Sequence, residues 1–379
     1  MLLNNKVLIA VAGSGKTWGI CKEVINKIDK KNKKKILLVT YTNKGLDSLK
    51  KTYAKQNLGV LHENVVFKTW FQFLLSDFIK PYQNYVVQRK NFIRSFDFSK
   101  QYGFINFYAR GKINHYINNS GDVLSNYASE FGVDENKKSN GKVINRLENI
   151  YSDIYFDEIQ DLSGEDLGIL ELLFYSSINI KCVGDYKQAT YTTHNAKKNK
   201  KITGINIVNY FKELENNNIV SIEYDLYTKR FGKELCQFAN SIFPNDLEKI
   251  IPHPKSKIVS ENIGIYIISK NDLKKYYDYY YPQILKYDIK TKTDGFSSLN
   301  FGQCKGMTFD RVVIYPNTVF KDFLVKNKEI QSKSKYYVAA TRARYSIAFV
   351  FDEIFENDHF KKESIKIGNE NISVSKYVE

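Results

Sequence analysis

The feature that most constrains this chain is a glycine-rich loop between a predicted strand and a predicted helix. Residues 7–11 form an apolar run typical of a buried parallel strand, and an amphipathic helix is predicted from Lys16 to about Lys31. Glycines let backbone N–H groups close around a phosphate, and the helix N-terminus adds partial positive charge. The pattern therefore predicts a nucleotide-binding loop, whose members are Ala12, Gly13, Ser14, Gly15, Lys16 and Thr17.

Two side chains at the end of this loop have distinct expected roles. Lys16 is expected to neutralise the β- and γ-phosphate oxygens, and the hydroxyl of Thr17 is expected to ligate Mg²⁺. The strict pattern has Gly where this chain has Ala10, which is a mild departure. The alternative, a chance Gly-Ser-Gly turn, does not explain why Lys-Thr follows at the right place after a strand.

Two adjacent carboxylates, Asp157 and Glu158, follow a predicted strand at 154–156. Carboxylates at the end of an apolar strand are costly unless a cation or a reacting water uses them. We expect Asp157 to hold Mg²⁺ and Glu158 to orient and deprotonate the attacking water. Gln188 follows the next predicted strand, at 180–183, and is expected to contact both the γ-phosphate and that water. Alone, Gln188 would be an ordinary turn residue.

The composition excludes several classes of protein. Lys and Arg number 57 against 41 Asp and Glu, a net charge of +16, which favours nucleic acid or nucleotides as partners. A lysine-rich composition throughout the chain is the alternative explanation of this charge. The four cysteines are far apart, which argues against a disulfide scaffold or a zinc site. Because no apolar run approaches the length of a membrane span, we expect a soluble, cytoplasmic protein without a membrane partner.

Strand–helix alternation predicts an α/β fold with parallel sheets. The rhythm breaks between residues 75 and 150, which indicates a mainly helical insertion with a loop-like segment at 134–141. A second α/β block is predicted from about 219–222 to 349–351. The residues after 351 are weakly patterned.

Arginine is used sparingly in this chain, which has only eight, because lysine supplies most of its positive charge. The arginines are therefore enriched for places that need a planar bidentate fork on phosphate. Arg230 and Arg342, in the second α/β block, are candidates for arginine fingers. The alternative for each is a surface ion pair.

In this order the motifs resemble those of superfamily 1 helicases of the UvrD/Rep/PcrA type. The phosphate loop resembles motif I, Asp157–Asp161 resembles motif II, and Tyr337–Ala343 resembles motif VI. The remaining matches are residues 39–44 with motif Ia, 68–71 with Ib, 184–191 with III, Arg230 with IV and 303–310 with V.

The resemblance implies two RecA-like domains with ATP and Mg²⁺ bound between them. Domain 1A would comprise residues 1–75 and 151–217, a helical 1B-like insertion residues 76–150, and domain 2A residues 218–379. Because only residues 231–302 separate motifs IV and V, we expect the family's 2B domain to be absent or vestigial. Arg230, Arg342 and Gly306 would complete the nucleotide site from domain 2A.

Single-stranded DNA would cross both domains in the family, held by phosphate contacts and base stacking. The candidate contacts are Tyr41, Trp70 and Tyr191 for stacking, and Thr42, Asn43 and Thr69 for phosphate or sugar. A core position is the open alternative for each aromatic residue.

The departures from the family concern the base and the ribose of the nucleotide. No Gln precedes the phosphate loop, Lys229 stands where the family has an adenine-stacking Tyr, and Thr308 replaces the acidic residue that meets the ribose. We therefore expect relaxed nucleotide selectivity, with GTP or dATP accepted beside ATP.

These features predict an ATP-dependent translocase or helicase on single-stranded DNA or DNA ends, with 3′-to-5′ polarity, acting in DNA repair or anti-phage defence. A protein partner, such as a nuclease, is expected by analogy with the helicase subunits of anti-phage systems such as Gabija. The alternative is a nucleotide- and DNA-sensing regulatory subunit of a nuclease complex with little unwinding activity. A third interpretation is a basic ATPase unrelated to DNA.

Overall fold

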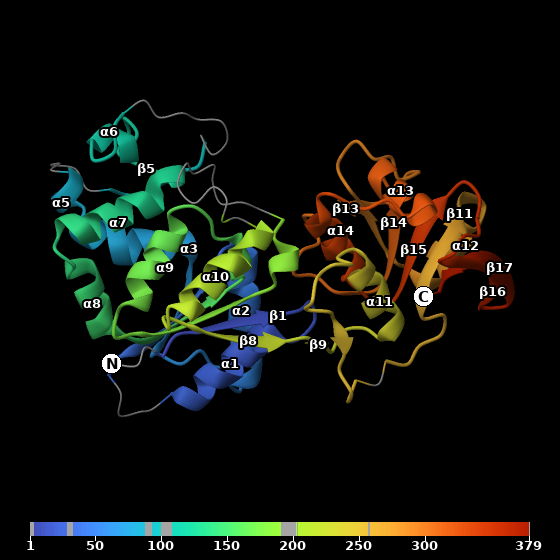
Figure 1. Ribbon diagram of the computed structural model, residues 1–379, viewed down its shortest axis with the longest axis horizontal. Helices are drawn as coiled ribbons and strands as arrows, with labels where there is room; N and C mark the ends of the chain where they lie inside the picture. The colour runs from blue at the N-terminus through green and yellow to red at the C-terminus, as the bar shows by residue number, and fades with distance from the viewer. Residues whose placement is uncertain are drawn as a thin grey trace. The chain divides into compact units, whose positions relative to one another are not determined.

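The computed structural model describes residues 4–28, 33–87, 93–99, 108–190, 202, 204–256 and 258–378. The chain divides into two compact units, drawn in Figure 1. The first unit comprises Met1–Ile9 and Lys16–Tyr224, and the second comprises Ala10–Gly15 and Asp225–Glu379. Both units are built on a mainly parallel sheet covered by helices, as the strand–helix alternation predicts.

The sheet of the first unit has the strand order β3-β2-β6-β7-β1-β8. The pairs β1–β7, β7–β6, β6–β2 and β2–β3 are all parallel, so the carboxyl ends of these strands meet at one edge. The strands are β1 (Lys6–Ala10), β2 (Lys35–Thr40), β3 (Val65–Thr69), β6 (Tyr151–Asp157), β7 (Asn179–Gly184) and β8 (Ser221–Asp225).

Helices cover both faces of this sheet, and each face buries its own apolar cluster. Ile20 and Val24 of α1 (Lys16–Lys27) pack with Leu49 of α2 (Asn43–Gln56) and Tyr155 of β6 on one face. The larger cluster on the other face includes residues of α9 (Asp166–Phe174) and α10 (Ile207–Asn216). The short turns η3 (Ile159–Asp161), η4 (Tyr186–Gln188) and η5 (Gly204–Asn206) lie between these elements.

The described part of the insertion is mainly helical, and it packs on the larger cluster. The segment 134–141 was expected to be a loop, but residues 134–138 end helix α7, because Phe131 faces the core and anchors that helix. The elements are α3 (Trp70–Phe73), η1 (Leu74–Ile79), α4 (Lys80–Tyr82), α5 (Asn84–Val87), β4 (Phe96–Asp97), α6 (Ile113–Tyr116), β5 (Val123–Leu124), η2 (Ser125–Tyr127), α7 (Ala128–Lys138) and α8 (Lys142–Ile150).

The sheet of the second unit has the order β13-β12-β14-β15-β11-β17-β16. Strands β11 to β15 pair in parallel, whereas β17 runs antiparallel to β11 and to β16. Its strands are β11 (Gly264–Ser269), β12 (Gln283–Lys286), β13 (Ser298–Asn300), β14 (Phe309–Tyr315), β15 (Ala343–Phe351), β16 (Phe360–Ile367) and β17 (Glu370–Tyr377); β9 (Tyr227–Thr228) and β10 (Ile251–Pro252) form a separate pair.

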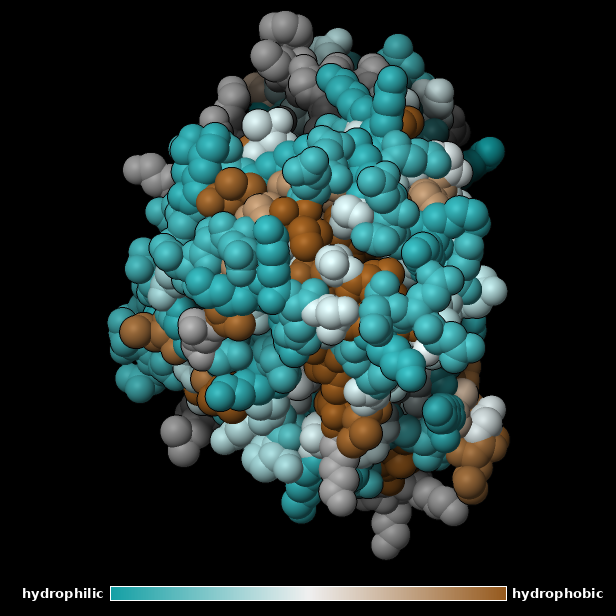
Figure 2. All heavy atoms as spheres, turned by 90° about the vertical axis from the view of Figure 1, so that its right-hand side faces the viewer, coloured by the Kyte–Doolittle hydropathy of each residue, from teal (hydrophilic) through white to brown (hydrophobic). Residues whose placement is uncertain are grey.

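The helices of the second unit bury two further apolar clusters against its sheet. They are α11 (Lys233–Ser241), α12 (Lys270–Tyr280), α13 (Thr318–Lys326) and α14 (Lys333–Ala340). The weakly patterned tail folds as the β16–β17 hairpin and extends the sheet. Figure 2 shows the molecule from the right-hand side of Figure 1: hydrophilic residues cover much of this face, with a band of hydrophobic residues among them. The exposed lysines of β16, Lys361, Lys362 and Lys366, discourage this edge strand from pairing with other chains.

One strand lies in a different sheet from the one expected. The apolar run at 219–222 was expected to open the second α/β block, but β8 is instead the outer strand of the first sheet, beside β1. The backbone N–H of Ser221 donates to the Asn5 carbonyl at 3.0 Å, which fixes the start of β8 next to β1.

Among the described residues, no helix is both long enough and apolar enough to cross a membrane.

Candidate nucleotide and nucleic-acid sites

Thr17 and Asp157 meet at the carboxyl edge of the first sheet, as the sequence predicts. Thr17 lies in the first turn of α1 and Asp157 ends β6; the Thr17 hydroxyl donates to Asp157 Oδ2 at 2.8 Å. A threonine hydroxyl and a carboxylate are oxygen ligands of the kind that Mg²⁺ prefers. These two side chains therefore fit a magnesium ion, with the hydrogen bond between them holding the pair in register.

The acidic pair has an unusual electrostatic and backbone setting. Burial raises the pKa of Asp157, and the neighbouring charge of Glu158 raises it further, whereas Thr17 and Lys16 oppose the shift. Glu158 has φ +59°, in the left-handed region, and its N–H donates to Asp157 Oδ1 at 3.0 Å. A non-glycine residue held in this region stores strain, which is a recurrent property of functional sites.

A chain of side-chain hydrogen bonds joins the ends of β6 and β7. Gln160 donates to the Glu158 carboxylate, and its Oε1 accepts the Asp185 N–H at 3.0 Å. Gln188 Nε2 donates to Asp185 Oδ2 at 2.7 Å. An added Cβ at position 184 would lie 2.6 Å from Ile159 Cγ2 and 3.2 Å from the Ile159 backbone N, so glycine is favoured there. The structure thus connects the predicted γ-phosphate sensor Gln188 to the predicted base Glu158 through two intervening residues, Asp185 and Gln160.

The start of the phosphate loop groups with the second unit. Gly13 and Gly15 have φ of +80° and +95°, which favours glycine at both positions. A Cβ at Gly13 would lie 2.6 Å from Arg230 Cβ, so Arg230 lies close to this loop. Ala12 and Ser14 are buried, and among the described residues Ser14 Oγ has no hydrogen-bond partner. An orphaned hydroxyl in a glycine-rich loop is suited to donate to a phosphate oxygen.

Arg342 is held inside the second unit by carbonyl groups. Its side chain is buried, and its guanidinium donates to the carbonyls of Val338 at 2.8 Å and Met307 at 3.1 Å. Arg230 Nη1 donates to the Thr341 carbonyl at 2.6 Å. Gly306, with φ +79°, has open space where a side chain would stand. The finger roles of the two arginines stay predictions.

Trp18 is a residue that the sequence reasoning passed over. It directly follows Thr17 in the first turn of α1, and 49% of its surface is exposed. Gln56 of α2 donates to its carbonyl at 3.1 Å. A large aromatic residue next to the Lys-Thr pair was the available signal, because an exposed indole is suited to stack on a nucleobase.

The predicted DNA contacts Tyr41, Thr42, Asn43 and Thr69 all line one pocket, of about 520 Å³. The pocket lies at the carboxyl ends of β2 and β3, because Tyr41 follows β2 and Thr69 ends β3. The other lining residues are Phe71, Gln72, Leu75, Arg94, Ser95, Phe96 and Phe98. The insertion thus contributes Arg94, Ser95 and both later phenylalanines, none of which the sequence reasoning singled out.

Four of the eleven residues that line this pocket are aromatic. The Phe71 ring lies 5.8 Å from Tyr41, 5.2 Å from Phe96 and 5.0 Å from Phe98, measured between centroids. Phe98 is 48% exposed, so part of its ring is free to meet a ligand. Aromatic faces beside an arginine suit a nucleobase and its phosphate without reading sequence.

The two threonines also serve as helix caps. Thr42 Oγ1 accepts the Gly45 N–H at 3.0 Å at the start of α2, and Thr69 Oγ1 accepts the Gln72 N–H at 3.2 Å at the start of α3. Each hydroxyl keeps its own proton, which can still be donated to a phosphate oxygen. The structure therefore gives both threonines a structural role beside the predicted contact.

The prediction that Trp70 stacks on a base is wrong in this structure. Trp70 is 2% exposed and belongs to the core cluster, since its ring packs against Phe73 and Phe156. Tyr191, the other stacking candidate of this group, lies outside the described residues.

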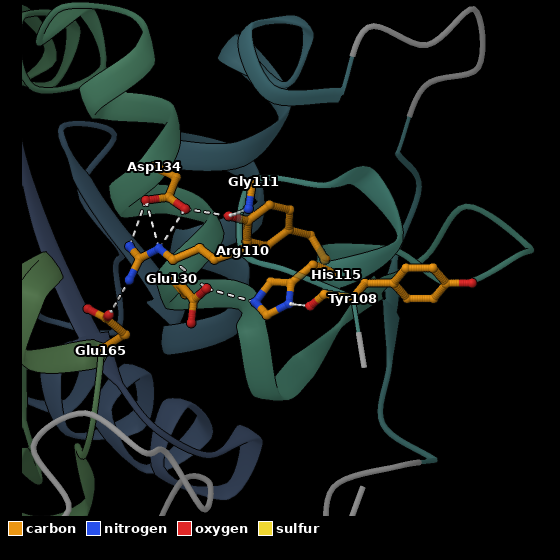
Figure 3. Close-up of polar contacts among 8 residues, drawn as sticks. Tyr108, Arg110, Gly111, His115, Glu130, Asp134 and Glu165 are labelled. Carbon is orange, nitrogen blue, oxygen red and sulfur yellow. Dashed lines mark hydrogen bonds and ion pairs between the residues drawn. The ribbon is translucent and has the colours of Figure 1, made fainter. Parts of the chain in front are cut away.

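A polar cluster fastens the insertion to the segment after the acidic pair (Figure 3). Arg110 donates to both carboxylate oxygens of Asp134 and, at 2.8 Å, to Glu165 Oε1. Although burial would raise the pKa of Asp134, hydrogen bonds from Arg110 and Tyr116 hold it below its ordinary value. His115 lies between the Glu130 carboxylate and the Tyr108 carbonyl, at 2.7 and 2.8 Å. The guanidinium of Arg110 thus binds carboxylates of the fold, and Arg110 is not a candidate for binding phosphate.

Comparison with protein families finds one match. A family model described as the UvrD/REP helicase N-terminal domain matches residues 2–106 and 72–206, which together span more than half of the chain. A search of the curated proteins finds no match.

Two solved structures are similar to this chain. The PRRSV helicase has 13% sequence identity and a TM-score of 0.45, over 99% of this chain and 60% of that one. The arterivirus nonstructural protein 10 (helicase), solved in complex with DNA, has 15% identity and a TM-score of 0.46, over 92% of this chain and 61% of that one. This chain spans about three fifths of the length of these structures.

Proposed function

Because the chain belongs to the UvrD/REP helicase family, we propose that it is a nucleoside-triphosphate-driven translocase on single-stranded DNA, with 3′-to-5′ polarity. The observation that carries the proposal is the pairing of two features along one sheet edge. The Thr17–Asp157 pair and its polar network lie at the ends of β6 and β7, and the aromatic pocket lies at the ends of the neighbouring β2 and β3.

In this proposal the loop residues bind the nucleotide through its phosphates. Lys16 neutralises the β- and γ-oxygens, Ser14 donates its buried hydroxyl, and Gly306 with the arginines Arg230 and Arg342 completes the site. Thr17 and Asp157 hold Mg²⁺, which when bound neutralises charge on the phosphate oxygens. ATP is the expected nucleotide.

Glu158 is the proposed general base. Its carboxylate accepts a hydrogen bond from the Gln160 amide, whose oxygen accepts the Asp185 N–H, so the carboxylate is oriented before substrate arrives. In this position it would accept a proton from the water that attacks the γ-phosphorus. Gln188, bonded to Asp185, would report the state of the γ-phosphate to the same network.

The aromatic pocket is the proposed DNA site. Tyr41 and Phe98 offer ring surface for a base, whereas Arg94, Thr42, Asn43 and Thr69 offer donors for the backbone. Stacking is sequence-tolerant because every base has a π-face, which suits a motor that steps along any strand.

The central test is hydrolysis with and without a single-stranded oligonucleotide, with Lys16→Ala as the inactive control. We expect stimulation by the oligonucleotide; a rate that does not respond to DNA would contradict the proposal. Comparable turnover of ATP, GTP and dATP would support relaxed nucleotide selectivity, whereas strict use of ATP would contradict it.

Tryptophan fluorescence gives a separate test of nucleotide binding. The chain has two tryptophans, and only Trp18 is exposed, since Trp70 is buried. We propose that Trp18 stacks on the nucleobase, so a nucleotide should quench the exposed emission but inorganic tripolyphosphate should not. Equal quenching by both ligands would place the base elsewhere.

The resemblance also supports a role in DNA repair or anti-phage defence with a protein partner, such as a nuclease. The alternative function, a DNA-sensing regulatory subunit, differs from the motor in one measurable way. A strand-displacement assay with the purified chain should show unwinding if it is a motor, and DNA-stimulated hydrolysis without unwinding if it is a sensor.

A further inference from the structure

Trp70 lies between the aromatic pocket and the acidic pair, and contacts the surroundings of both. It is the first residue of α3, and its neighbours in sequence, Thr69 and Phe71, both line the pocket. Its own side chain points away from them into the core of the first unit, where it is 2% exposed. A displacement of α3 by a ligand in the pocket would therefore be passed directly to the indole.

The indole contacts the residue that precedes the acidic pair. Its ring packs edge-to-face on Phe156, at 5.9 Å between centroids, and Phe156 directly precedes Asp157 in β6. Because protein interiors are close-packed, a shifted ring displaces its neighbour and leaves no gap. This contact connects α3 to the end of β6.

The indole also contacts Asp166, which follows the acidic pair in the chain. Its N–H donates to Asp166 Oδ1 at 3.1 Å, and Asp166 Oδ2 accepts the Ser163 N–H at 3.2 Å. Ser129 of α7 also donates to Asp166, which is 1% exposed. A buried donor or acceptor that loses its partner is costly, so the indole and this carboxylate are expected to move together.

A short, hydrogen-bonded segment connects Ser163 to Glu158. The Asp161 N–H donates to the Glu158 carbonyl at 3.1 Å, and the Leu162 N–H donates to the Ile159 carbonyl at 3.1 Å. The turn η3 therefore fixes the distance between Glu158, the proposed general base, and Ser163, whose N–H is bonded to Asp166. A shift at Ser163 would be transmitted to the backbone of Glu158.

We propose that Trp70 is a positioning residue that couples occupancy of the aromatic pocket to the placement of Glu158. The inference rests on the proposed function, since it names the route by which DNA would stimulate hydrolysis. Trp70 does so without touching DNA or nucleotide: its ring acts on Phe156 and its N–H acts on Asp166. The route lies entirely inside the first unit.

The first experiment is a double-mutant cycle on the ratio of hydrolysis rates with and without an oligo-dT strand. Trp70→Phe keeps a ring but removes the N–H, and Asp166→Asn keeps a carbonyl oxygen while it removes the charge. We expect Trp70→Phe to lower the ratio by about 5- to 10-fold, with the DNA-free rate and the DNA affinity within about 2-fold of the wild type. Adding Asp166→Asn to Trp70→Phe should cause little further loss, because both changes break one connection.

The matched control is Phe211→Leu in α10, which alters a buried ring of the same core cluster whose ring contact is with Tyr210, at 5.3 Å between centroids. It should lower the melting temperature without changing the ratio. Trp70→Phe would overturn the proposal if it left the ratio unchanged, or if it only lowered both rates together as a packing defect does. A wild-type protein whose hydrolysis ignores DNA would instead refute the proposed function itself.

A second measurement does not depend on the stability of these variants. Trp18→Phe leaves Trp70 as the single tryptophan, so its emission reports the buried indole alone. Binding of oligo-dT to the aromatic pocket should shift or quench this emission, although the indole is shielded from solvent. Saturating DNA binding with an unchanged Trp70 spectrum would count against the coupling.

Discussion

The two candidate sites of the first unit lie at adjacent strand ends but differ in the kind of side chain that forms them. The nucleotide side, around Asp157, is a network of short polar contacts in which Gln160 and Asp185 hold other polar groups. The pocket side, around Tyr41, has four aromatic rings in its lining beside polar side chains such as those of Arg94 and Thr42. Both are reached from one sheet edge.

This difference teaches what each ligand demands. Charge that develops on a phosphate during reaction is stabilised by donors and carboxylates fixed beforehand, since reorganisation during the reaction costs energy. A base of any sequence offers a flat apolar face, so rings suit it better than a fixed pattern of donors. Altering the polar network should therefore affect rate, whereas altering the rings should affect affinity.

The largest expected effect is on the polar side. Glu158→Gln keeps the shape of the side chain but removes the proposed base, so kcat should fall by about 10²- to 10⁴-fold while binding of single-stranded DNA persists. Steady-state hydrolysis and fluorescence anisotropy measure the two quantities. Glu63→Gln, at an exposed position, is the control. Retained hydrolysis in the Glu158 variant would mean that another group activates the water.

The corresponding change on the aromatic side is Phe98→Ala. Loss of one stacking ring should weaken binding of an oligo-dT strand by about 1–3 kcal/mol, and saturating DNA should restore the stimulated rate. Anisotropy titrations at fixed salt measure the affinity. Tyr175→Ala removes an exposed ring outside the pocket and should leave the affinity unchanged. If the two variants bind DNA equally well, the pocket is not the DNA site.

The buried carboxyl of Glu135 tests how much the hydrogen-bond partners of Asp157 matter. Glu135 in α7 is fully buried, and within the described structure its carboxyl oxygens have no hydrogen-bond partner. Burial raises its pKa to about 10, from an ordinary value of 4.5. Because the folded-state pKa is the higher one, its contribution to stability is complete below pH 4.5 and is lost as the pH rises toward 10.

Glu135→Gln should therefore change stability in a pH-dependent way. At pH 8–9 the variant should be more stable than the wild type by about 1–3 kcal/mol, whereas near pH 4.5 the two should differ little. Thermal unfolding followed across pH 4.5–9 measures the difference. Glu213→Gln, at an exposed position of α10, should show no such trend. A constant offset at every pH would indicate that Glu135 is not neutral in the folded state.

The smallest expected effect concerns Thr42, which has both a structural role and a predicted DNA contact. Thr42 caps α2 and lines the aromatic pocket, so Thr42→Ala should cost about 1 kcal/mol of stability through the lost cap. Thr42→Ser keeps the cap and should restore it. Chemical denaturation measures the stability, and a DNA titration shows whether the hydroxyl also binds phosphate. If Thr42→Ala changes neither quantity, both roles of the hydroxyl are excluded.

The predictions about the nucleotide side depended on short-range pattern. The phosphate loop stands between a strand and a helix in the structure, and Asp157 ends a strand, because these features are set by residues close in sequence. The predictions about the aromatic side depended on which way a ring points. Tyr41 lines the pocket and Trp70 is in the core, although each directly follows a strand-end threonine.

The sequence by itself determined the fold class, the family and the order of the polar groups along the strand ends. It also assigned Thr17 and Asp157 to one magnesium site, and the structure joins the two side chains by a hydrogen bond. Only the tertiary structure assigned β8 to the first sheet, continued α7 through residues 134–138, and brought Phe96 and Phe98 beside Tyr41. Those outcomes depend on packing between residues far apart in the chain, and the pattern of neighbouring residues does not predict such contacts.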